Sequence, residues 1–196
     1  GNKEKYLKDW QTLLSRAHNY RNTYDPADGF MKAKTKEGQW ATGGYSEGTP
    51  WTYSWYVPHD VQGLINLMGG KKIFSERLNQ CFQEGHYVHD NEPPLHYAYL
   101  FNFSGQPWKT QQWARSITED SYSADPGGIP GNDDLGALSS WFVFSAMGFY
   151  PVTPGTAQYQ IGSPLFEKTT IHLSNGKQFN IIANHVSGKN KYIQSA

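Results

Sequence analysis

The chain has 196 residues and a formal net charge of zero, with 17 basic and 17 acidic residues. Because this balance provides no basic surface for phosphates, we expect no nucleic-acid partner. No apolar stretch approaches the roughly 20 residues that span a bilayer, so we also expect no membrane span.

The first predicted element is an amphipathic helix, in which apolar residues recur at helical spacing: Tyr6, Leu7, Trp10, Leu13, Leu14 and Ala17. Residues 22–40 are predicted to be irregular, and residues 43–58 to form a long loop rich in aromatic side chains. A helix is then predicted over residues 60–68, where a Gly-Gly pair ends it. Another helix is predicted over residues 71–82.

The next predicted loop, residues 85–94, is rich in histidine and carboxylates. Pro94 then opens a short aromatic helix, and Pro107 suits the first position of a helix that ends at Asp120. After a Pro/Gly-rich loop at 125–130, residues 135–147 are almost entirely small or apolar. A helix of that composition is predicted to be buried.

The pattern changes after residue 150. Three segments alternate or are rich in β-branched residues and are predicted to be strands: 159–161, 169–173 and 178–182. An Asn-Gly pair at 175–176 predicts a hairpin between the last two. The fold class is therefore mainly α followed by β, and we divide the chain into residues 1–153 and 154–196.

Two adjacent carboxylates, Asp133 and Asp134, precede the apolar helix in the segment Gly-Asn-Asp-Asp-Leu-Gly. Because that helix is predicted to be buried, its first carboxylates are expected at the edge of a core. The simplest explanation is that one aspartate caps the helix, but capping needs only one of the two. The alternative is that this segment also has a chemical role, carried by the other aspartate.

Glu47 is a second candidate, because it lies among aromatic residues and glycines. Such surroundings desolvate a carboxyl group and raise its pKa, as a general acid requires. A solvated loop glutamate is the alternative. At the next helix entry, Asp60 is favoured by the helix dipole and is explained first by capping.

The histidine-rich loop contains candidate metal ligands. Zinc binding by His86, His89 and Glu92, with His96 as a fourth ligand, is disfavoured because a Pro-Pro pair prevents a continuous helix of ligands. Asn91 and Glu92 offer oxygen ligands of the kind that calcium prefers. Plain hydrogen bonding within the loop remains open. Three loops are rich in polar residues: the first at 43–58, the second at 85–94 and the third at 125–134. If the helices form a toroid, these three polar loops converge and bring Glu47, Glu92 and the aspartate pair together.

Several long motifs occur in a fixed order: Tyr-Ser-Glu-Gly-Thr-Pro-Trp (45–51), Trp-Tyr-Val-Pro-His-Asp-Val-Gln-Gly-Leu-Ile (55–65), Leu-Met-Gly-Gly (67–70), His-Asp-Asn-Glu-Pro (89–93), Gly-Gln-Pro-Trp-Lys-Thr (105–110), Gly-Asn-Asp-Asp-Leu-Gly (131–136) and Gly-Phe-Tyr-Pro-Val (148–152). Together they resemble the C-terminal part of the calcium-dependent α-mannosidases of glycoside hydrolase family 92. Aromatic residues make up 15% of the chain, which suits sugar stacking but also ordinary cores.

This resemblance implies the second half of an (α/α)6 toroid, with C-terminal strands that belong to an associated β-sandwich. It implies an exo-acting, inverting α-mannosidase with Glu47 as general acid and Asp134 as general base beside Asp133. It also implies calcium at Asn91, Glu92 and Asn132, and a sugar site shaped by Trp51, Tyr53, His59, Asp60 and Trp108. The implied partners are a mannose-containing glycan and the N-terminal part of the same enzyme.

The chain departs from the family at Thr49-Pro50, where an Asn-Ala type of pair is common. Family members are also much longer, and they are typically bacterial and exported, so a secreted or periplasmic location is expected. Two alternatives stay open. One is a carbohydrate-binding or structural fragment without turnover, and the other is an (α/α)6 glycosidase or phosphorylase of different specificity.

Overall fold

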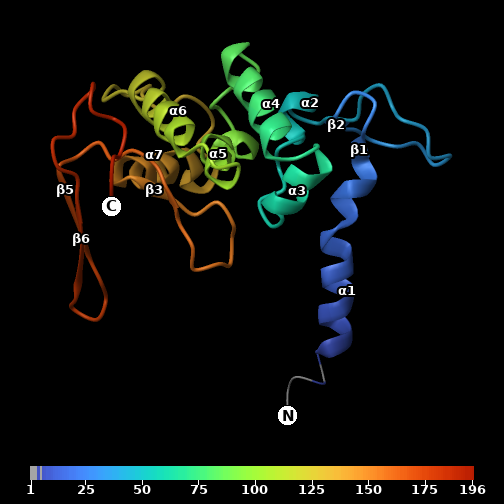
Figure 1. Cartoon of the computed structure of the whole chain (residues 1–196), viewed down its shortest axis with the longest axis horizontal. Helices are drawn as coiled ribbons and strands as arrows, with labels where there is room; N and C mark the ends of the chain where they lie inside the picture. Colours follow the sequence, from blue (N-terminus) through green and yellow to red (C-terminus); the bar gives the residue numbers. More distant parts are fainter. Residues whose placement is uncertain (1–3, 5) are drawn as a thin grey trace.

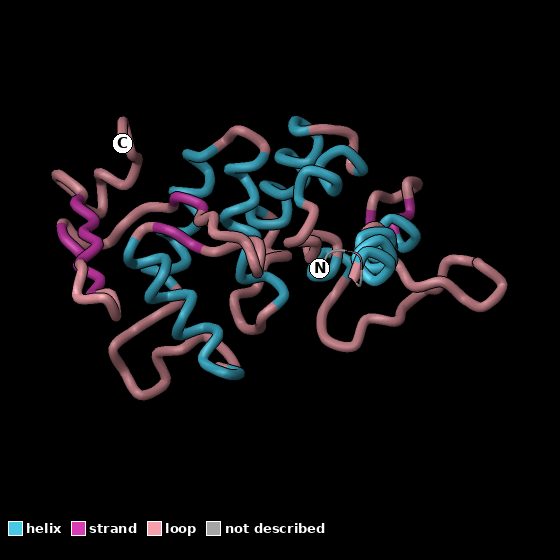
Figure 2. Tube along the Cα trace, turned by 90° about the horizontal axis from the view of Figure 1, so that it is seen from below, coloured by secondary structure: helices cyan, strands magenta, loops and turns pink. Residues whose placement is uncertain are grey.

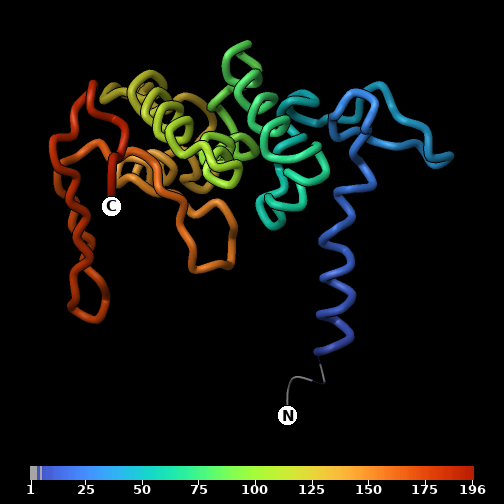
Figure 3. Tube along the Cα trace, in the orientation of Figure 1, coloured from blue at the N-terminus to red at the C-terminus, as the bar shows by residue number. Residues whose placement is uncertain are grey.

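The computed structural model describes residue 4 and residues 6–196 and shows a helical body with two projecting arms (Figure 1). The main helices of the body are α3 (Val61–Leu67), α4 (Lys71–Gln83), α5 (Tyr97–Phe103), α6 (Pro107–Asp120) and α7 (Ala137–Met147). Helix α1 (Leu7–Ala17) and the hairpin of β5 (Lys168–His172) with β6 (Gln178–Ile182) extend from opposite ends of this body (Figure 3). The helix-rich architecture with small sheets agrees with the predicted order of helices before strands.

Helix α5 lies at the centre of the core, where residues 97–101 are all buried. It packs against α3, α4 and α6. The largest fully buried side chains around it are Trp55, Trp141, Tyr97, Tyr99 and Phe74. Removal of side chains of this size from water contributes about 1.5–3 kcal/mol each, so these aromatic residues dominate the stability of the body.

Most helix ends agree with the sequence prediction because local signals set them. The Asp60 carboxylate accepts a hydrogen bond from the Gly63 N–H at 2.9 Å and caps α3. Gly69 and Gly70, both with positive φ, separate α3 from α4. Helix α6 begins at Pro107 and ends at Asp120, as predicted. The aromatic helix is preceded by a 3-10 turn, η2 (Pro93–His96).

Helix α7 differs from its prediction in start and burial. It begins at Ala137 because Leu135 (φ 53°) and Gly136 (φ 74°) adopt left-handed conformations in the turn η3 (Asp134–Gly136). Its buried residues are Leu138, Trp141, Ser145 and Ala146, whereas Val143 is 54% exposed. The helix is apolar on every face, but the described residues cover only one of them.

Two predictions of irregular structure were also wrong. Residues 24–31 contain a small hairpin of β1 (Tyr24–Asp25) and β2 (Phe30–Met31), whose two-residue strands are too short to show alternation. The long aromatic loop contains a one-turn helix, α2 (Pro50–Tyr53), which the side chains of Thr49 and Thr52 cap. A Pro at the first position and this capping pair were its sequence signals.

The strand region contains two antiparallel pairs (Figure 2). β5 and β6 pair in the register Lys168 with Ile182, and Gly176 turns the hairpin with φ 79°. This confirms the hairpin at the Asn-Gly pair. β3 (Phe149–Tyr150) pairs with β4 (Gln160–Ile161) across the proposed boundary at residue 154, so the division into two parts stays a prediction. Within the described residues, no helix is both long and apolar enough to cross a membrane.

Candidate active site

The second of the three polar loops contacts both the first and the third. The Asn91 Nδ2 of the second loop donates a hydrogen bond to Glu47 Oε2 of the first at 3.1 Å. The second loop also contacts the third, because a Cβ on Gly131 would overlap the backbone of Asp90. The segment at 90–91 therefore connects the loop of Glu47 to the loop that leads into α7.

A cavity of about 240 Å³ lies between the first two loops, lined by Glu47, Gly48, Thr49, Thr52, His86, Tyr87, Val88, Asp90, Asn91, Pro94 and Tyr97. The Glu47 backbone N–H donates to the Tyr53 hydroxyl at 3.3 Å. Glu47 itself is exposed, so the described residues do not provide the desolvated surroundings that the sequence suggested for it. Its carboxylate is open to a ligand from outside the body.

The aspartate pair is divided between two roles. Asp133 accepts hydrogen bonds from the backbone N–H groups of Leu138 (2.9 Å) and Ser139 (3.1 Å) and from the Ser139 hydroxyl (2.5 Å). The bonds from the Ser139 hydroxyl and backbone lower the pKa of Asp133, against a smaller opposing effect of burial. Asp133 is therefore the cap of α7.

Asp134 is exposed, and its carboxylate accepts a hydrogen bond from Asn132 Nδ2 at 2.9 Å. Since Asp133 occupies the first N–H groups of the helix, Asp134 takes no part in capping. Of the two adjacent carboxylates, the second is the one free to act on a substrate.

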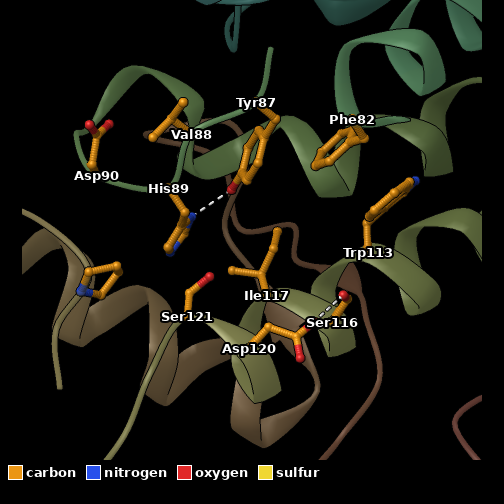
Figure 4. A pocket seen from close by; sticks show the side chains of 11 residues that line it. Phe82, Tyr87, Val88, His89, Asp90, Trp113, Ser116, Ile117, Asp120 and Ser121 are labelled. Carbon is orange, nitrogen blue, oxygen red and sulfur yellow. Dashed lines mark hydrogen bonds between the residues drawn. The ribbon is translucent and has the colours of Figure 1, made fainter. Parts of the chain in front are cut away.

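A buried histidine, His89, bonds to Tyr87 in the second loop (Figure 4) and to Tyr122, which in turn bonds to the start of α7. His89 is 5% exposed, and burial lowers its pKa to about 4, so the ring is neutral at neutral pH. The Tyr122 hydroxyl donates a hydrogen bond to the Leu138 carbonyl at 3.0 Å. The same hydroxyl therefore accepts a hydrogen bond from His89 Nε2 at 2.7 Å. His89 Nδ1 then accepts from the Tyr87 hydroxyl at 2.5 Å. Sequence reasoning missed this chain of bonds, because no local signal pairs residue 89 with residue 122.

Two of the predicted sugar-binding aromatic residues lie beside the cavity. Trp51 stacks on His86 with ring centroids 4.5 Å apart, and Tyr53 touches the Glu47 backbone through its hydroxyl. Trp108 is 52% exposed in the first turn of α6. Trp108 is not among the described residues that line the cavity beside Glu47, so its role stays a prediction.

His59 and Asp60 contact the end of α1 and the turn that follows it. His59 Nε2 lies 2.8 Å from the Ala17 carbonyl oxygen, and Asp60 accepts from the Tyr20 hydroxyl at 2.8 Å. Burial raises the pKa of Asp60, but the bonds from Tyr20, Gly63 and Arg21 outweigh it and leave that pKa below its usual value. Their role in sugar binding also stays a prediction.

Two of the proposed metal ligands, Asn91 and Asn132, make hydrogen bonds within their own loops. Asn91 Oδ1 accepts from the Glu92 backbone N–H at 2.9 Å, and Asn132 Nδ2 donates to Asp134. Within the described part of the chain, no group of three or more His, Cys, Asp or Glu residues is placed to hold a metal. The zinc alternative has no support, because both nitrogens of His89 bond to tyrosines and His96 Nε2 bonds to the Trp55 carbonyl at 3.0 Å.

Comparison with known proteins identifies the family. The model of the glycosyl hydrolase family 92 catalytic domain matches residues 2–196. The chain belongs to this family. The predicted resemblance is thereby confirmed, and the assignment to the C-terminal part of the family fits the match.

Solved structures of family 92 enzymes share the fold. A GH92 alpha-mannosidase from Bacteroides thetaiotaomicron has a TM-score of 0.90 and 40% identity, over 97% of this chain and 28% of its own. A GH92 inverting mannosidase from the same bacterium has a TM-score of 0.85 and 37% identity, over 93% of this chain and 29% of its own. The family 92 chain therefore spans less than a third of either relative.

A curated relative is an uncharacterized secreted glycosidase from Arthroderma benhamiae, 35% identical over 149 residues. That match covers 74% of this chain and 19% of the fungal protein. The activity of a whole family 92 enzyme is therefore a proposal for this chain.

Proposed function

We propose that the full-length enzyme carrying this chain is an exo-acting, inverting α-mannosidase that removes terminal α-linked mannose from glycans. The observation that carries this proposal is the meeting of the three loops. Asn91 contacts Glu47, Asp90 packs on Gly131, and Asp133 takes the helix cap and leaves Asp134 available. Family membership supports glycoside hydrolysis as the reaction class.

In the proposed reaction, Glu47 is the general acid and gives its proton to the glycosidic oxygen as the bond to the anomeric carbon breaks. Asp134 is the general base and takes a proton from the water that attacks the anomeric carbon on the face opposite the leaving group. Inverting enzymes hold the two carboxyl groups roughly 6.5–9.5 Å apart to leave room for that water. We expect this spacing for Glu47 and Asp134 when substrate is bound.

Neighbouring amides orient both carboxyl groups in this proposal. The Asn91 amide binds one oxygen of Glu47 and leaves the other for the transferable proton. Asn132 binds Asp134 Oδ1 and leaves its second oxygen for water. Trp51 and Tyr53 are proposed to stack on the terminal sugar, with His59, Asp60 and Trp108 shaping the site further out.

We extend the proposal to the architecture and to calcium. The body would form half of an (α/α)6 toroid, with the C-terminal strands joining a β-sandwich. Asn91, Glu92 and Asn132 offer the oxygen ligands that calcium prefers, but they do not complete a site by themselves. The remaining ligands would come from outside this chain.

Proton NMR of α-mannobiose hydrolysis by the full-length enzyme tests the mechanism. We expect β-mannose as the first product, and a loss of roughly 10²–10⁴-fold in kcat for Glu47→Gln and for Asp134→Asn. Glu76→Gln, a matched change on an exposed carboxyl of α4, serves as control. Hydrolysis unchanged in Glu47→Gln removes Glu47 from the mechanism.

The same assay tests the ion and the alternatives. Loss of hydrolysis in a chelator, restored by added calcium, supports the calcium site, whereas full activity in the chelator contradicts it. Sugar binding without any hydrolysis favours a carbohydrate-binding fragment. Product that forms only with added phosphate indicates a phosphorylase.

A further inference from the structure

A second cavity, of about 490 Å³, adjoins the candidate active site (Figure 4). Tyr87, Val88 and Asp90 line both cavities, so this short segment is the ridge between them. Nothing in the proposed mechanism uses the second cavity. Its volume lies within the range of about 300–1,000 Å³ that is usual for small-molecule sites.

One wall of this cavity is a stack of three aromatic rings. Phe82 lies between Tyr87 and Trp113, with ring centroids 4.4 Å and 4.7 Å away. Such a stack presents a rigid apolar surface at low cost in side-chain entropy. Pyranose rings have patches of C–H groups that pack well on such a surface.

Helix α6, which carries Trp113, also provides polar side chains to the lining of the cavity (Figure 4). Ser116 donates to Asp120 Oδ2 at 2.6 Å, and Asp120 is exposed, which leaves its other oxygen free for a ligand. Asp90 adds a second carboxylate at the ridge. Carboxylates accept hydrogen bonds from the hydroxyl groups of sugars.

The charges of the lining select the class of ligand. Asp90 and Asp120 are the charged residues that line the cavity within the described part of the chain, and no Lys or Arg joins them. An anionic ligand such as a phosphate would be repelled. A neutral ligand with an apolar face and hydroxyl groups along its edge satisfies both parts of this lining.

We propose that this cavity is a second saccharide subsite, which binds an inner sugar of the glycan whose terminal residue lies at Glu47. The inference rests on the proposed function and names an extended glycan as its substrate. The glycan would run over the ridge at Val88 from the first cavity into the second. The sugar would stack on Trp113, and one of its hydroxyl groups would donate a hydrogen bond to Asp120.

Substrate length tests this proposal in the full-length enzyme. We place the second cavity beyond the sugar that adjoins the terminal residue, so α-mannobiose should not reach it, whereas an α-mannotetraose of the same linkage should. We expect Asp120→Asn, through loss of a charged hydrogen bond, and Trp113→Phe, through loss of stacking area, each to raise KM for the tetraose roughly tenfold. The kcat values and the KM for mannobiose should stay unchanged, as should all constants in Glu76→Gln.

Each result decides the question. Equal changes for both substrates, or no change for either, overturn the second subsite. If wild-type enzyme hydrolyses neither substrate, the proposed function fails, and calorimetric titration with the tetraose tests the subsite separately. A dissociation constant for the tetraose that rises in Asp120→Asn but not in Glu76→Gln then supports the subsite, and an unchanged one overturns it.

Discussion

Helices α5 and α1 contrast sharply in how they are packed. Residues 97–101 of α5 are fully buried, whereas no residue of α1 is buried. Trp10 and Leu13 in α1 are 58% and 62% exposed, although they lie on a regular apolar face. The hairpin β5–β6 resembles α1, since Phe179 is 54% and Ile182 68% exposed. Periodicity shows which face of an element is apolar, but the surrounding chain decides whether that face is covered.

The two arms can be compared with the structures of longer relatives. The chain superimposes on a family 92 structure over 97% of its length with a TM-score of 0.90, yet covers 28% of that relative. Both arms therefore lie in the part of the chain that superimposes on a much longer relative, whereas the body between α3 and α7 has its own core. Variants of body and arm residues in the 196-residue chain test this difference.

The largest effect is expected in the body. Trp141 is completely buried, and its Nε1 donates to the Leu95 carbonyl at 2.6 Å. Trp141→Ala should lower the free energy of unfolding by about 3–5 kcal/mol, measured by urea denaturation with circular dichroism. Trp10→Ala in the arm should change it by less than about 0.5 kcal/mol. Equal losses in the two variants would show that α1 is packed in this chain.

Acid should weaken the body through His96. Burial lowers the pKa of His96 to about 4 from its ordinary 6.5, against the bond to the Trp55 carbonyl, and the rings of Tyr56 and Tyr97 enclose it. Between these values the unfolded chain binds a proton that the folded chain does not, so stability falls as the pH falls. The slope from this residue is about 1.4 kcal/mol per pH unit. Denaturation at several pH values should show a smaller slope in His96→Gln.

The aspartate pair should separate stability from chemistry. Asp133→Ala removes the cap of α7 and should lower Tm by roughly 2–4 °C, whereas Asp134→Ala should leave Tm nearly unchanged. The lowered pKa of Asp133 means that its contribution is present above its unfolded pKa and is lost as the pH falls through the folded value. Thermal scans at pH 7 and pH 3 measure both effects. A larger loss in Asp134→Ala would reverse the two assignments.

The smallest effect is expected in the hairpin arm. Phe179 lies opposite Ile171 on the exposed sheet. Thr is also a good strand former, so replacing Phe179 by Thr removes the aromatic ring but preserves the strand. Phe179→Thr should cost about 0.5 kcal/mol, typical of one cross-strand pair. A loss above about 2 kcal/mol in urea denaturation would contradict the view that this arm lacks a core of its own.

The sequence by itself determined the features that local chemistry controls. The ends of α3 and α6, the hairpin at Asn175 and Gly176, and the order of helices before strands follow from residues within a few positions of each other. The ordered motifs also identified family 92 and the candidate residues Glu47 and Asp134. Such signals act at short range, so they are readable without knowledge of the chain path.

Only the tertiary structure decided which groups meet and which faces are covered. The bond from Asn91 to Glu47 joins residues 44 positions apart, and that from His89 to Tyr122 joins residues 33 positions apart. It also assigned the cap to Asp133 and not to Asp134, because left-handed turns at 135 and 136 place the first carboxylate over the helix start. Contacts between distant segments depend on the whole path of the chain, and no short stretch of residues encodes them.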